Sequence, residues 1–308
     1  MRAVVISSFG GPEVLRIEQV PIPDPGPGQV RIQVQAASVN PADLAARAGV
    51  FGAMLPSGQY VLGWDVAGVV DAVGAQVTGF AIGDRVAGVS IWFREFVGTQ
   101  AEYVVLPASS IAAIPAGLST VDAATIPLNG LTAIQALDLT GLRPGQTLAV
   151  TGAAGAVGGY AVQLAARRGW RVVAVAGAQD EQLVRGLGAS TFVARSTDPS
   201  AAIRAVEPQG VHAVLDTANL SAAVIGAVRD HGAHIAVTTP AQPPPQRGVR
   251  VALVLVRPDG AALAELLALA VHGDLTIRVA ATYPFTQAAQ AHERLAQGGV
   301  RGRLVLVP

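Results

Sequence analysis

The sequence predicts an α/β protein that combines a doubly wound parallel sheet with a second, β-rich region. After about residue 122, apolar runs without polar alternation, such as 147–151 and 171–176, are separated by helical stretches. This pattern is typical of a parallel sheet that helices cover on both faces. Before about residue 125, glycine and proline separate short strands, and residues 30–36 alternate apolar and polar side chains as a half-buried strand does.

The β-rich region contains two further predicted strands, at 66–73 and 85–89. Alternating prolines within 21–27 predict an extended segment before the strand at 30–36, because proline cannot continue a helix. Glycines between these strands predict turns at Gly74, Gly79 and Gly83.

The second region predicts alternating helices and strands. The expected helices are 122–139, 157–168 and 181–187, and the expected strands are 147–151, 171–176, 213–215, 234–237 and 251–256. A triple proline at 243–245 predicts a surface loop. After about residue 259 the chain predicts one or two helices and a final strand at 303–307.

Composition excludes several classes of function. The formal net charge is zero, which argues against nucleic acid or an anionic membrane as a partner. The longest apolar runs, 251–256 and 266–271, are too short to span a bilayer, and the N-terminal residues lack a signal-peptide pattern, so we expect a cytoplasmic protein. The chain has no cysteine and no lysine, which excludes disulfides, thiolate chemistry and lysine Schiff bases.

A glycine-rich turn predicts a dinucleotide site in a Rossmann domain. Between the strand at 147–151 and the helix at 157–168 lies Ala153-x-Gly155-x-x-Gly158, a variant of the dinucleotide fingerprint with alanine at its first glycine. Glycine lets the backbone approach a pyrophosphate, and the helix start offers free amides to it. From this motif we expect cofactor contacts from Gly152, Ala154, Gly155, Ala156, Val157 and Gly158.

The choice between NADPH and NADH rests on the end of the strand at 171–176. NAD enzymes usually place an acid there for the ribose hydroxyl, and this strand ends without one, which favours NADPH. Against this, Gln179, Asp180 and Glu181 follow at once, where a basic residue would suit a 2′-phosphate. Arg185 and Arg195 are the nearest candidate clamps, although Arg185 is expected to be solvated on its helix.

Several segments together resemble the zinc-independent quinone oxidoreductases of the medium-chain dehydrogenase/reductase superfamily. They include Phe-Gly-Gly-Pro at 9–12, Ser-Val-Asn-Pro-Ala-Asp at 38–43 and Gly-Trp-Asp-Val-Ala-Gly at 63–68. The similarity extends in order over nearly the whole chain and continues at 83–86, 101–105, 128–133, 153–159, 291–295 and 302–306.

This resemblance implies a discontinuous GroES-like catalytic domain from residues 1–125 and 260–308, with a Rossmann domain at 126–259. It also implies an active site in the cleft between them and a homodimer formed through the edge strand at 251–256, although a buried strand explains that run as well. Nicotinamide cofactor and a quinone or enone substrate are the expected partners, with no nucleic acid and no membrane.

Zinc-dependent relatives carry cysteine where this chain has Asn40 and histidine where it has Trp64. Neither side chain replaces a thiolate or imidazole in a tetrahedral zinc site, so we expect no metal. The five histidines are expected to be surface or packing residues. Asp65, next to Trp64, is expected to satisfy buried backbone amides.

Without a metal, a quinone or α,β-unsaturated carbonyl is easier to reduce than an isolated ketone, since charge spreads into a quinol or enolate. Asn40 is the candidate hydrogen-bond donor to the carbonyl, and Asp43 would orient it or relay a proton; a turn residue and a helix cap are the structural alternatives. Thr132 resembles the family threonine beside the nicotinamide, with a plain helix residue as its alternative. Further cofactor contacts are expected from Gly177, Arg195, Thr217, Val237 and Arg303.

Some features depart from the family. Ala45 stands where some relatives carry a tyrosine, and the nearest phenol is Tyr60. The aromatic residues within 91–96 suit either a substrate-pocket wall or core packing. Two alternatives to a quinone or enone reductase therefore stay open: an enoyl-thioester reductase of polyketide or fatty-acid assembly, and a dinucleotide-binding protein without reductase turnover.

Overall fold

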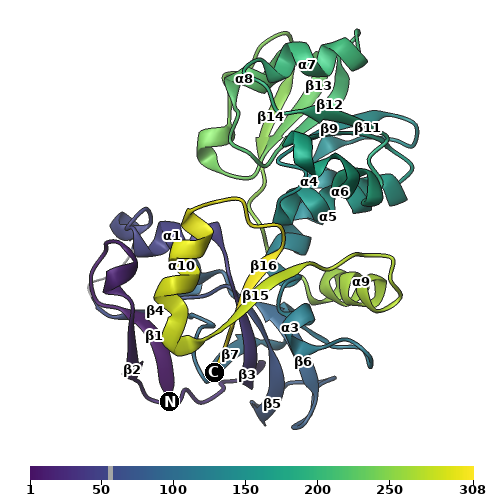
Figure 1. Ribbon diagram of the computed structural model, residues 1–308. Coiled ribbons are helices and arrows are strands. Elements are labelled where there is room, and N and C mark those ends of the chain that lie inside the picture. The colour runs from purple at the N-terminus through teal and green to yellow at the C-terminus, as the bar shows by residue number, and fades with distance from the viewer. Residues whose placement is uncertain (55–57) are drawn as a thin grey trace. The chain divides into compact units, whose positions relative to one another are not determined.

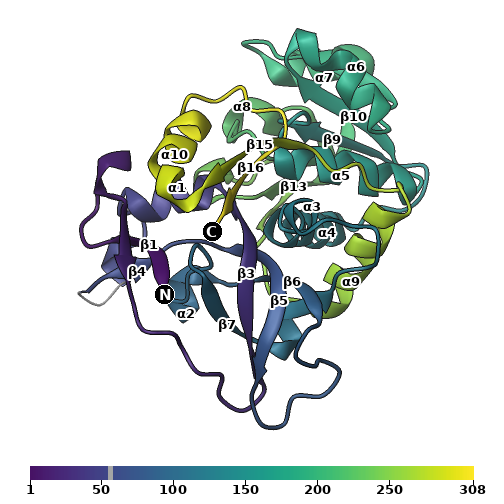
Figure 2. The same ribbon diagram turned by 60° about the horizontal axis from the view of Figure 1, so that its bottom comes forward.

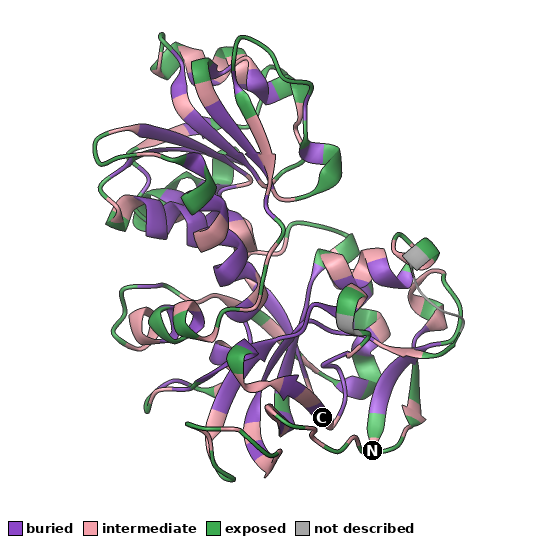
Figure 3. Ribbon diagram, turned by 180° about the vertical axis from the view of Figure 1, so that it is seen from behind, coloured by how far each residue is buried: buried purple, intermediate pink, exposed green. Residues whose placement is uncertain are grey.

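The computed structural model describes residues 1–54 and 58–308 and divides into two compact units (Figure 1). Unit 1 comprises Met1–Leu128 and Arg257–Pro308, and unit 2 comprises Asn129–Val256. Buried residues concentrate in the strands of each unit (Figure 3). Among the described helices, none combines the length and the apolar character that crossing a membrane requires.

Unit 2 is built on a six-stranded sheet in the order β11-β10-β9-β12-β13-β14, with every neighbouring pair parallel. This is the Rossmann strand order, and the predicted doubly wound class is confirmed. Helices α5 and α6 lie on one face of the sheet, and α7 and α8 lie on the other (Figure 1). The bounds are α4 (Pro127–Thr140), β9 (Thr147–Thr151), α5 (Ala156–Arg167), β10 (Arg171–Ala176), α6 (Glu181–Gly186), β11 (Thr191–Ala194), α7 (Pro199–Val206), β12 (Val211–Asp216), α8 (Ala222–Ile225), β13 (Val228–Ala236) and β14 (Arg250–Leu253).

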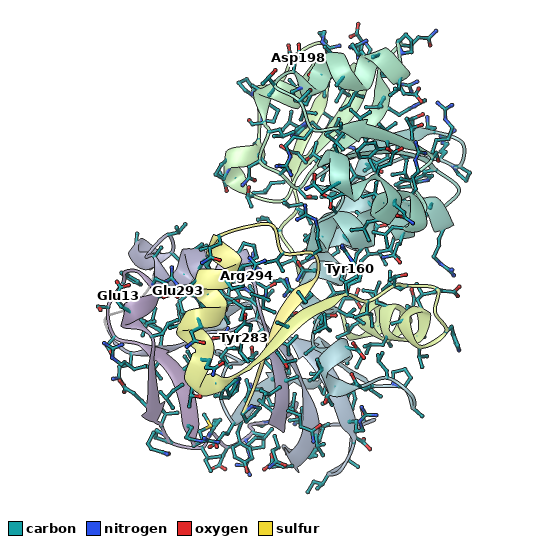
Figure 4. All side chains as sticks on the ribbon, in the orientation of Figure 1. Glu13, Tyr160, Asp198, Tyr283, Glu293 and Arg294 are labelled. Carbon is teal, nitrogen blue, oxygen red and sulfur yellow. The ribbon has the colours of Figure 1, made fainter. Side chains whose placement is uncertain are left out.

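The local sequence explains these elements. Strand β9 is buried along its whole length, as its unbroken apolar run requires. Helix α7 begins at Pro199, and the Asp198 carboxylate caps it by accepting a hydrogen bond from Ala201 N at 2.9 Å. Asp198 and the buried Tyr160 of α5 are labelled in Figure 4.

Unit 1 contains a seven-stranded sheet in the order β15-β16-β3-β5-β6-β8, with β7 also paired to β3, and a three-stranded sheet in the order β2-β1-β4. Apart from the parallel pair β15 and β16, the seven-stranded sheet is antiparallel. The strands are β1 (Arg2–Ile6), β2 (Arg16–Gln19), β3 (Gln29–Val39), β4 (Tyr60–Val61), β5 (Asp65–Val73), β6 (Arg85–Val89), β7 (Tyr103–Pro107), β8 (Ile111–Ala113), β15 (Val279–Pro284) and β16 (Arg303–Val307). The helices are α1 (Pro41–Arg47), α2 (Trp92–Glu95), α3 (Thr120–Ala123), α9 (Gly260–Val271) and α10 (Ala288–Ala296).

Strand β3 organises unit 1. It runs beside β5 (Figure 2), and its other edge pairs with β7 through residues 29–33 and with β16 through residues 37–39. Its apolar side chains, including Val30 and Ile32, are fully buried, which contributes about 1.5–3 kcal/mol each. The end of β3 leads directly into α1.

One predicted helix is wrong. The stretch 122–139 was expected to be continuous, but α3 ends at Ala123 and α4 begins at Pro127. Proline lacks a backbone N–H and disfavours the helical conformation in the residue before it, so the helix restarts with Pro127 in its first turn.

Candidate functional site

The turn between β9 and α5 has the features of a phosphate-binding turn. Gly152 has φ +61°, which glycine adopts readily, and Gly155 N donates to Gly152 O at 2.8 Å. A Cβ on Gly158 would lie 2.3 Å from Gly152 O, so only glycine lets α5 start this close to the turn. This geometry is compatible with a cofactor-binding turn, and the predicted cofactor contacts of these glycines stay predictions.

The same turn presents unsatisfied donors next to open space. Within the described chain, no acceptor pairs with the backbone amides of Ala156, Val157 and Gly158 at the start of α5. A Cβ on Gly155 would meet, within 4 Å, only Gly152 O among the described atoms compared, at 3.0 Å. Amides at a helix N-terminus bind anionic groups, and these residues therefore fit a dinucleotide pyrophosphate.

The remaining predicted cofactor residues of unit 2 lie at the carboxyl ends of neighbouring parallel strands, with one exception. Gly177 directly follows β10, Arg195 follows β11, Thr217 follows β12 and Val237 follows β13. The sheet thus brings these four residues and the β9–α5 turn to one edge, where ligands of this fold class bind. Thr132 lies instead within α4 and is buried.

A buried carboxylate organises the loop that follows β12. Asp216 Oδ1 accepts hydrogen bonds from Thr151 Oγ1 at 2.6 Å and from Ala218 N at 3.1 Å, and Oδ2 accepts one from Ser221 N at 2.8 Å. Thr217 N donates to Thr151 Oγ1, and Thr217 Oγ1 donates to Thr151 O at 2.6 Å. The network fixes the loop 217–221 against the end of β9. We call it the Asp216 network.

The predicted catalytic residues lie in unit 1, where β16, β3 and β5 are adjacent. The register pairs Leu304 with Val39, so Arg303 lies opposite Asn40, and Asp65 begins β5 near Ser38. Asp65 Oδ2 accepts from Ser38 Oγ at 2.5 Å and from Asn40 Nδ2 at 2.8 Å, and it lies 3.3 Å from Arg303 Nη2. We call this group the Asp65 network.

Arg303 and a backbone amide complete the Asp65 network. Arg303 Nη2 donates to Ser38 Oγ and to Asn40 Oδ1, both at 2.7 Å. Leu128 N donates to Asp65 Oδ1 at 2.6 Å, in agreement with the expectation that Asp65 satisfies a buried amide. Arg303, predicted to contact the cofactor, thus neutralises a buried carboxylate in unit 1.

Asp43 is the second buried carboxyl of this region. Its Oδ2 accepts from Asn40 N at 2.7 Å at the start of α1, as a residue of a capping box does, and its Oδ1 accepts from Gln100 Nε2 at 3.1 Å. Burial raises the pKa of Asp43 to about 8, with a further increase from the charge of Asp65. A pKa raised in this direction favours the protonated carboxyl near neutral pH.

Burial also raises the pKa of Asp65, while the positive charge of Arg303 and hydrogen bonds from Ser38 and Asn40 act against that increase. Asn40 is buried, with 1% of the residue exposed. Its Nδ2 has one short hydrogen bond, to Asp65, and a long contact of 3.5 Å with Ser38 O.

The aromatic residues form a cluster in unit 1. Trp64 and Trp92 are buried with ring centroids 5.5 Å apart, and Phe51 packs on both at 6.4 Å and stacks on Phe93 at 5.2 Å. Trp92 Nε1 donates to Val61 O at 2.6 Å. For Trp92, core packing is therefore the interpretation that the structure supports.

The donor set for a metal ion is limited. In the parts of the chain that the structure describes, no three His, Cys, Asp or Glu side chains come together as a metal site. Trp64, at the position of a zinc ligand in zinc-dependent relatives, lies in the aromatic cluster.

The residues that hold both networks together were not predicted from the sequence. Asp216, Thr151, Ser38 and Gln100 had not been singled out. A polar residue ending an otherwise apolar strand is the signal that points to Asp216, because such strand ends carry ligand-binding residues. No local signal pointed to Gln100.

Comparisons with known proteins agree with this architecture. Residues 26–116 match the alcohol dehydrogenase GroES-like domain, and residues 187–306 match a family described as zinc-binding dehydrogenase. Quinone oxidoreductase from Sus scrofa is 30% identical over 100% of this chain and 98% of that protein. The chloroplastic NADPH-dependent alkenal/one oxidoreductase of Arabidopsis thaliana is 30% identical over 100% of this chain and 80% of that protein.

Solved structures with the same fold include proteins of both cofactor types. An NAD-dependent alcohol dehydrogenase has a TM-score of 0.90 at 34% identity, covering 100% of both chains. A mycobacterial protein in complex with NADPH has a TM-score of 0.86 at 28% identity, also covering 100% of both chains. These likenesses leave the choice between the two cofactors open.

Proposed function

The chain belongs to the quinone oxidoreductase family of the medium-chain dehydrogenase/reductase superfamily, and we propose that it uses NADPH to reduce a quinone or an α,β-unsaturated carbonyl compound without a metal ion. The free amides of Ala156, Val157 and Gly158 beside the open face of Gly155 carry this proposal. They suit a pyrophosphate at the edge of a Rossmann sheet. When bound there, the nicotinamide supplies the hydride.

The preference for NADPH rests on the charges after β10 and β11. Arg195 N donates to Ala176 O at 2.7 Å, which holds Arg195 beside the end of β10, and its side chain is exposed with no partner among the described residues. The negative charge of Glu181 is paired with Arg185, four residues along α6, whose Nε lies 2.8 Å from Glu181 Oε1. Arg195 is therefore the cation available to a 2′-phosphate.

Binding of 2′,5′-ADP tests this preference without any turnover. Arg195→Gln should raise the Kd for 2′,5′-ADP about tenfold or more, because a charge-assisted hydrogen bond is lost, and should leave the Kd for 5′-AMP unchanged. Arg185→Gln is the matched control, because that arginine already pairs with Glu181. Equal losses for both nucleotides in Arg195→Gln would contradict the assignment.

On the acceptor side, we propose that Asn40 donates an amide hydrogen to the carbonyl oxygen of the acceptor. Negative charge grows on this oxygen during hydride transfer, so a fixed donor stabilises the transition state more than the ground state. Asp43, whose pKa burial raises to about 8, is proposed to supply or relay the proton that completes the reduction. Arg303 and Asp65 hold Asn40 in place.

The chain offers a control within the same network. Asn40→Ala should lower kcat about tenfold or more, because the carbonyl loses its donor. Ser38→Ala removes another member of the Asp65 network and leaves the amide of Asn40, so it should lower kcat far less. An unchanged kcat in Asn40→Ala, or equal losses in the two variants, would remove Asn40 from the chemistry.

Absence of zinc chemistry is also part of the proposal. The sequence has no cysteine, and Asn40 and Trp64 stand at positions of zinc ligands in zinc-dependent relatives. Activity should therefore survive dialysis against a chelator. Loss of activity that zinc restores would contradict it.

The activity itself is tested by following the oxidation of NADPH and NADH with three acceptors: 1,4-benzoquinone, 9,10-phenanthrenequinone and a crotonyl thioester. Faster NADPH oxidation with a quinone is the expected result. Turnover of the thioester alone would identify an enoyl-thioester reductase, and tight cofactor binding without turnover would identify a binding protein.

We further propose a homodimer that forms through β14, the edge strand of the unit 2 sheet. An unpaired edge strand offers backbone groups to a second copy. Light scattering should give twice the mass of the chain.

A further inference from the structure

We propose that Asn219 binds the nicotinamide half of the cofactor by donating a hydrogen bond from Nδ2 to the carboxamide oxygen. This inference rests on the proposed function, because it concerns the same dinucleotide site. It adds a residue outside the glycine-rich turn and assigns the loop 217–221 to one half of the ligand.

The strand order locates this loop in the site. The order in which the strands follow one another in the sheet reverses between β9 and β12, and ligands of Rossmann sheets bind beyond the carboxyl ends of the strands at such a point. The pyrophosphate site is after β9, and Arg195, proposed for the adenosine 2′-phosphate, follows β11 on one side of it. The nicotinamide half then extends to the other side, over the loops after β12 and β13.

Asn219 is held in an orientation that leaves its donor free. Thr238 Oγ1, in the loop after β13, donates to Asn219 Oδ1 at 2.5 Å. This bond fixes the amide plane and turns Nδ2 away from Thr238. Asn219 is exposed, and no acceptor among the described residues pairs with its Nδ2.

The backbone of this loop has two residues with positive φ, Asn219 and Ser221, and hydrogen bonds hold it in one conformation. Asn219 has φ +57°, which asparagine tolerates better than most residues. Ser221 has φ +50° and ψ −118°, a strained conformation, and the bond from Ser221 N to Asp216 Oδ2 holds it. Strain of this kind persists where the surrounding structure maintains it, and here the Asp216 network fixes the loop before any ligand arrives.

A primary carboxamide suits this donor. The carboxamide oxygen of nicotinamide accepts hydrogen bonds and is the strongest neutral acceptor of that half of the dinucleotide. A donor that is already oriented loses little conformational freedom on binding, so its contribution to affinity is large for a single neutral hydrogen bond.

The test compares two ligands on one set of variants by calorimetric titration. NADPH carries the nicotinamide, whereas 2′-phospho-ADP-ribose is the same molecule without it. Asn219→Gly keeps a residue that accepts positive φ and deletes the amide, so the fold of the loop is retained. Asn219→Asp keeps the acceptor for Thr238 Oγ1 and deletes the donor.

Both variants should raise the Kd for NADPH about five- to tenfold and leave the Kd for 2′-phospho-ADP-ribose unchanged within about twofold. Thr238→Val, which only frees the amide to rotate, should raise the Kd for NADPH about two- to threefold. The 3-acetylpyridine analogue of NADPH keeps the oxygen and lacks the NH₂ group, so Asn219→Gly should weaken it as much as it weakens NADPH.

Equal weakening of both ligands would overturn the inference, because the loop would then support the whole site rather than the nicotinamide. No change for either ligand would also overturn it. If the wild-type chain binds neither ligand, the proposed function itself fails, and this result is distinct from a selective failure at Asn219.

Discussion

Each unit contains a buried aspartate with three or more hydrogen-bond donors, and the two aspartates are satisfied in different ways. The donors to Asp65 in unit 1 include the guanidinium of Arg303, 238 residues away in sequence. The donors to Asp216 in unit 2 are the hydroxyl of Thr151 and the backbone amides of Ala218 and Ser221, in the loop that follows β12. The Asp65 network therefore ties distant parts of the chain together, whereas the Asp216 network shapes one loop.

This difference teaches that burial alone does not define the role of a carboxylate. A charge paired with a buried cation mainly affects stability, because removing one partner leaves the other uncompensated. A carboxylate that holds backbone amides mainly affects the conformation of a loop, and here that loop lies at the proposed cofactor site. Replacing each aspartate should therefore change a different property.

The largest effect is expected for Asp65→Asn. Loss of the negative charge leaves Arg303 buried without compensation and should lower the free energy of unfolding of unit 1 by about 3–5 kcal/mol. Urea unfolding measures this through tryptophan fluorescence. A Trp170→Phe background leaves only Trp64 and Trp92, both in unit 1, as reporters.

A double variant separates charge from shape. Asp65→Asn combined with Arg303→Gln removes both charges and should recover more than half of the lost stability. A double variant as unstable as the single one would show that the charge pair is not what Asp65 provides.

A smaller loss of stability is expected for Asp216→Asn, about 1–3 kcal/mol, because Ser221 N loses its acceptor. The larger consequence is for binding. If the loop keeps its competent conformation only about a tenth of the time, the Kd for NADPH rises about tenfold. Asp65→Asn should leave this Kd unchanged, and a similar increase in both variants would break the distinction between the two networks.

The last effect is a dependence of stability on pH, and it concerns Asp43. Because burial raises its pKa to about 8, the native state keeps a proton that the unfolded state releases above about pH 4. The stability that Asp43 contributes is therefore fully present below pH 4 and is lost as pH rises through 8, by at most about 1.4 kcal/mol per pH unit. Asp43→Asn should flatten unfolding free energies measured between pH 5 and 8, and a slope equal to that of the wild-type chain would contradict the assignment.

Features that depend on consecutive residues were predicted from the sequence more accurately than contacts between residues far apart in the chain. Strands β9 and β10 match their predicted ranges, because each has an apolar centre without charged residues, Leu148–Val150 in β9 and Val172–Ala176 in β10. The glycine turn and the four predicted residues after β10 to β13 lie at the ends of the strands, and their contact with a cofactor stays a prediction. The helix is interrupted before Pro127, but the apolar periodicity continues across this interruption, so 122–139 was predicted as one helix.

The side-chain networks were less predictable. Asp65 was expected to satisfy an amide, and Asn40 to be the donor, but their connection to Arg303 depends on the register of β16 with β3. Thr151 and Asp216 meet across 65 residues because β9 and β12 are neighbours in the sheet. No local pattern reveals which strands become neighbours, so such pairs require the three-dimensional structure.

The pairing of β16 with β3 has a consequence for synthesis of the chain. Residues 303–307 leave the ribosome after every other strand of both units, and until then residues 37–39 of β3 lack their partner on that side. Unit 2 lies between the two parts of unit 1, so it can close before the segment that emerged first has finished folding. The nascent N-terminal region therefore has an unpaired sheet edge until residues 303–307 have been synthesised. In this state, chaperone binding would protect it from aggregation.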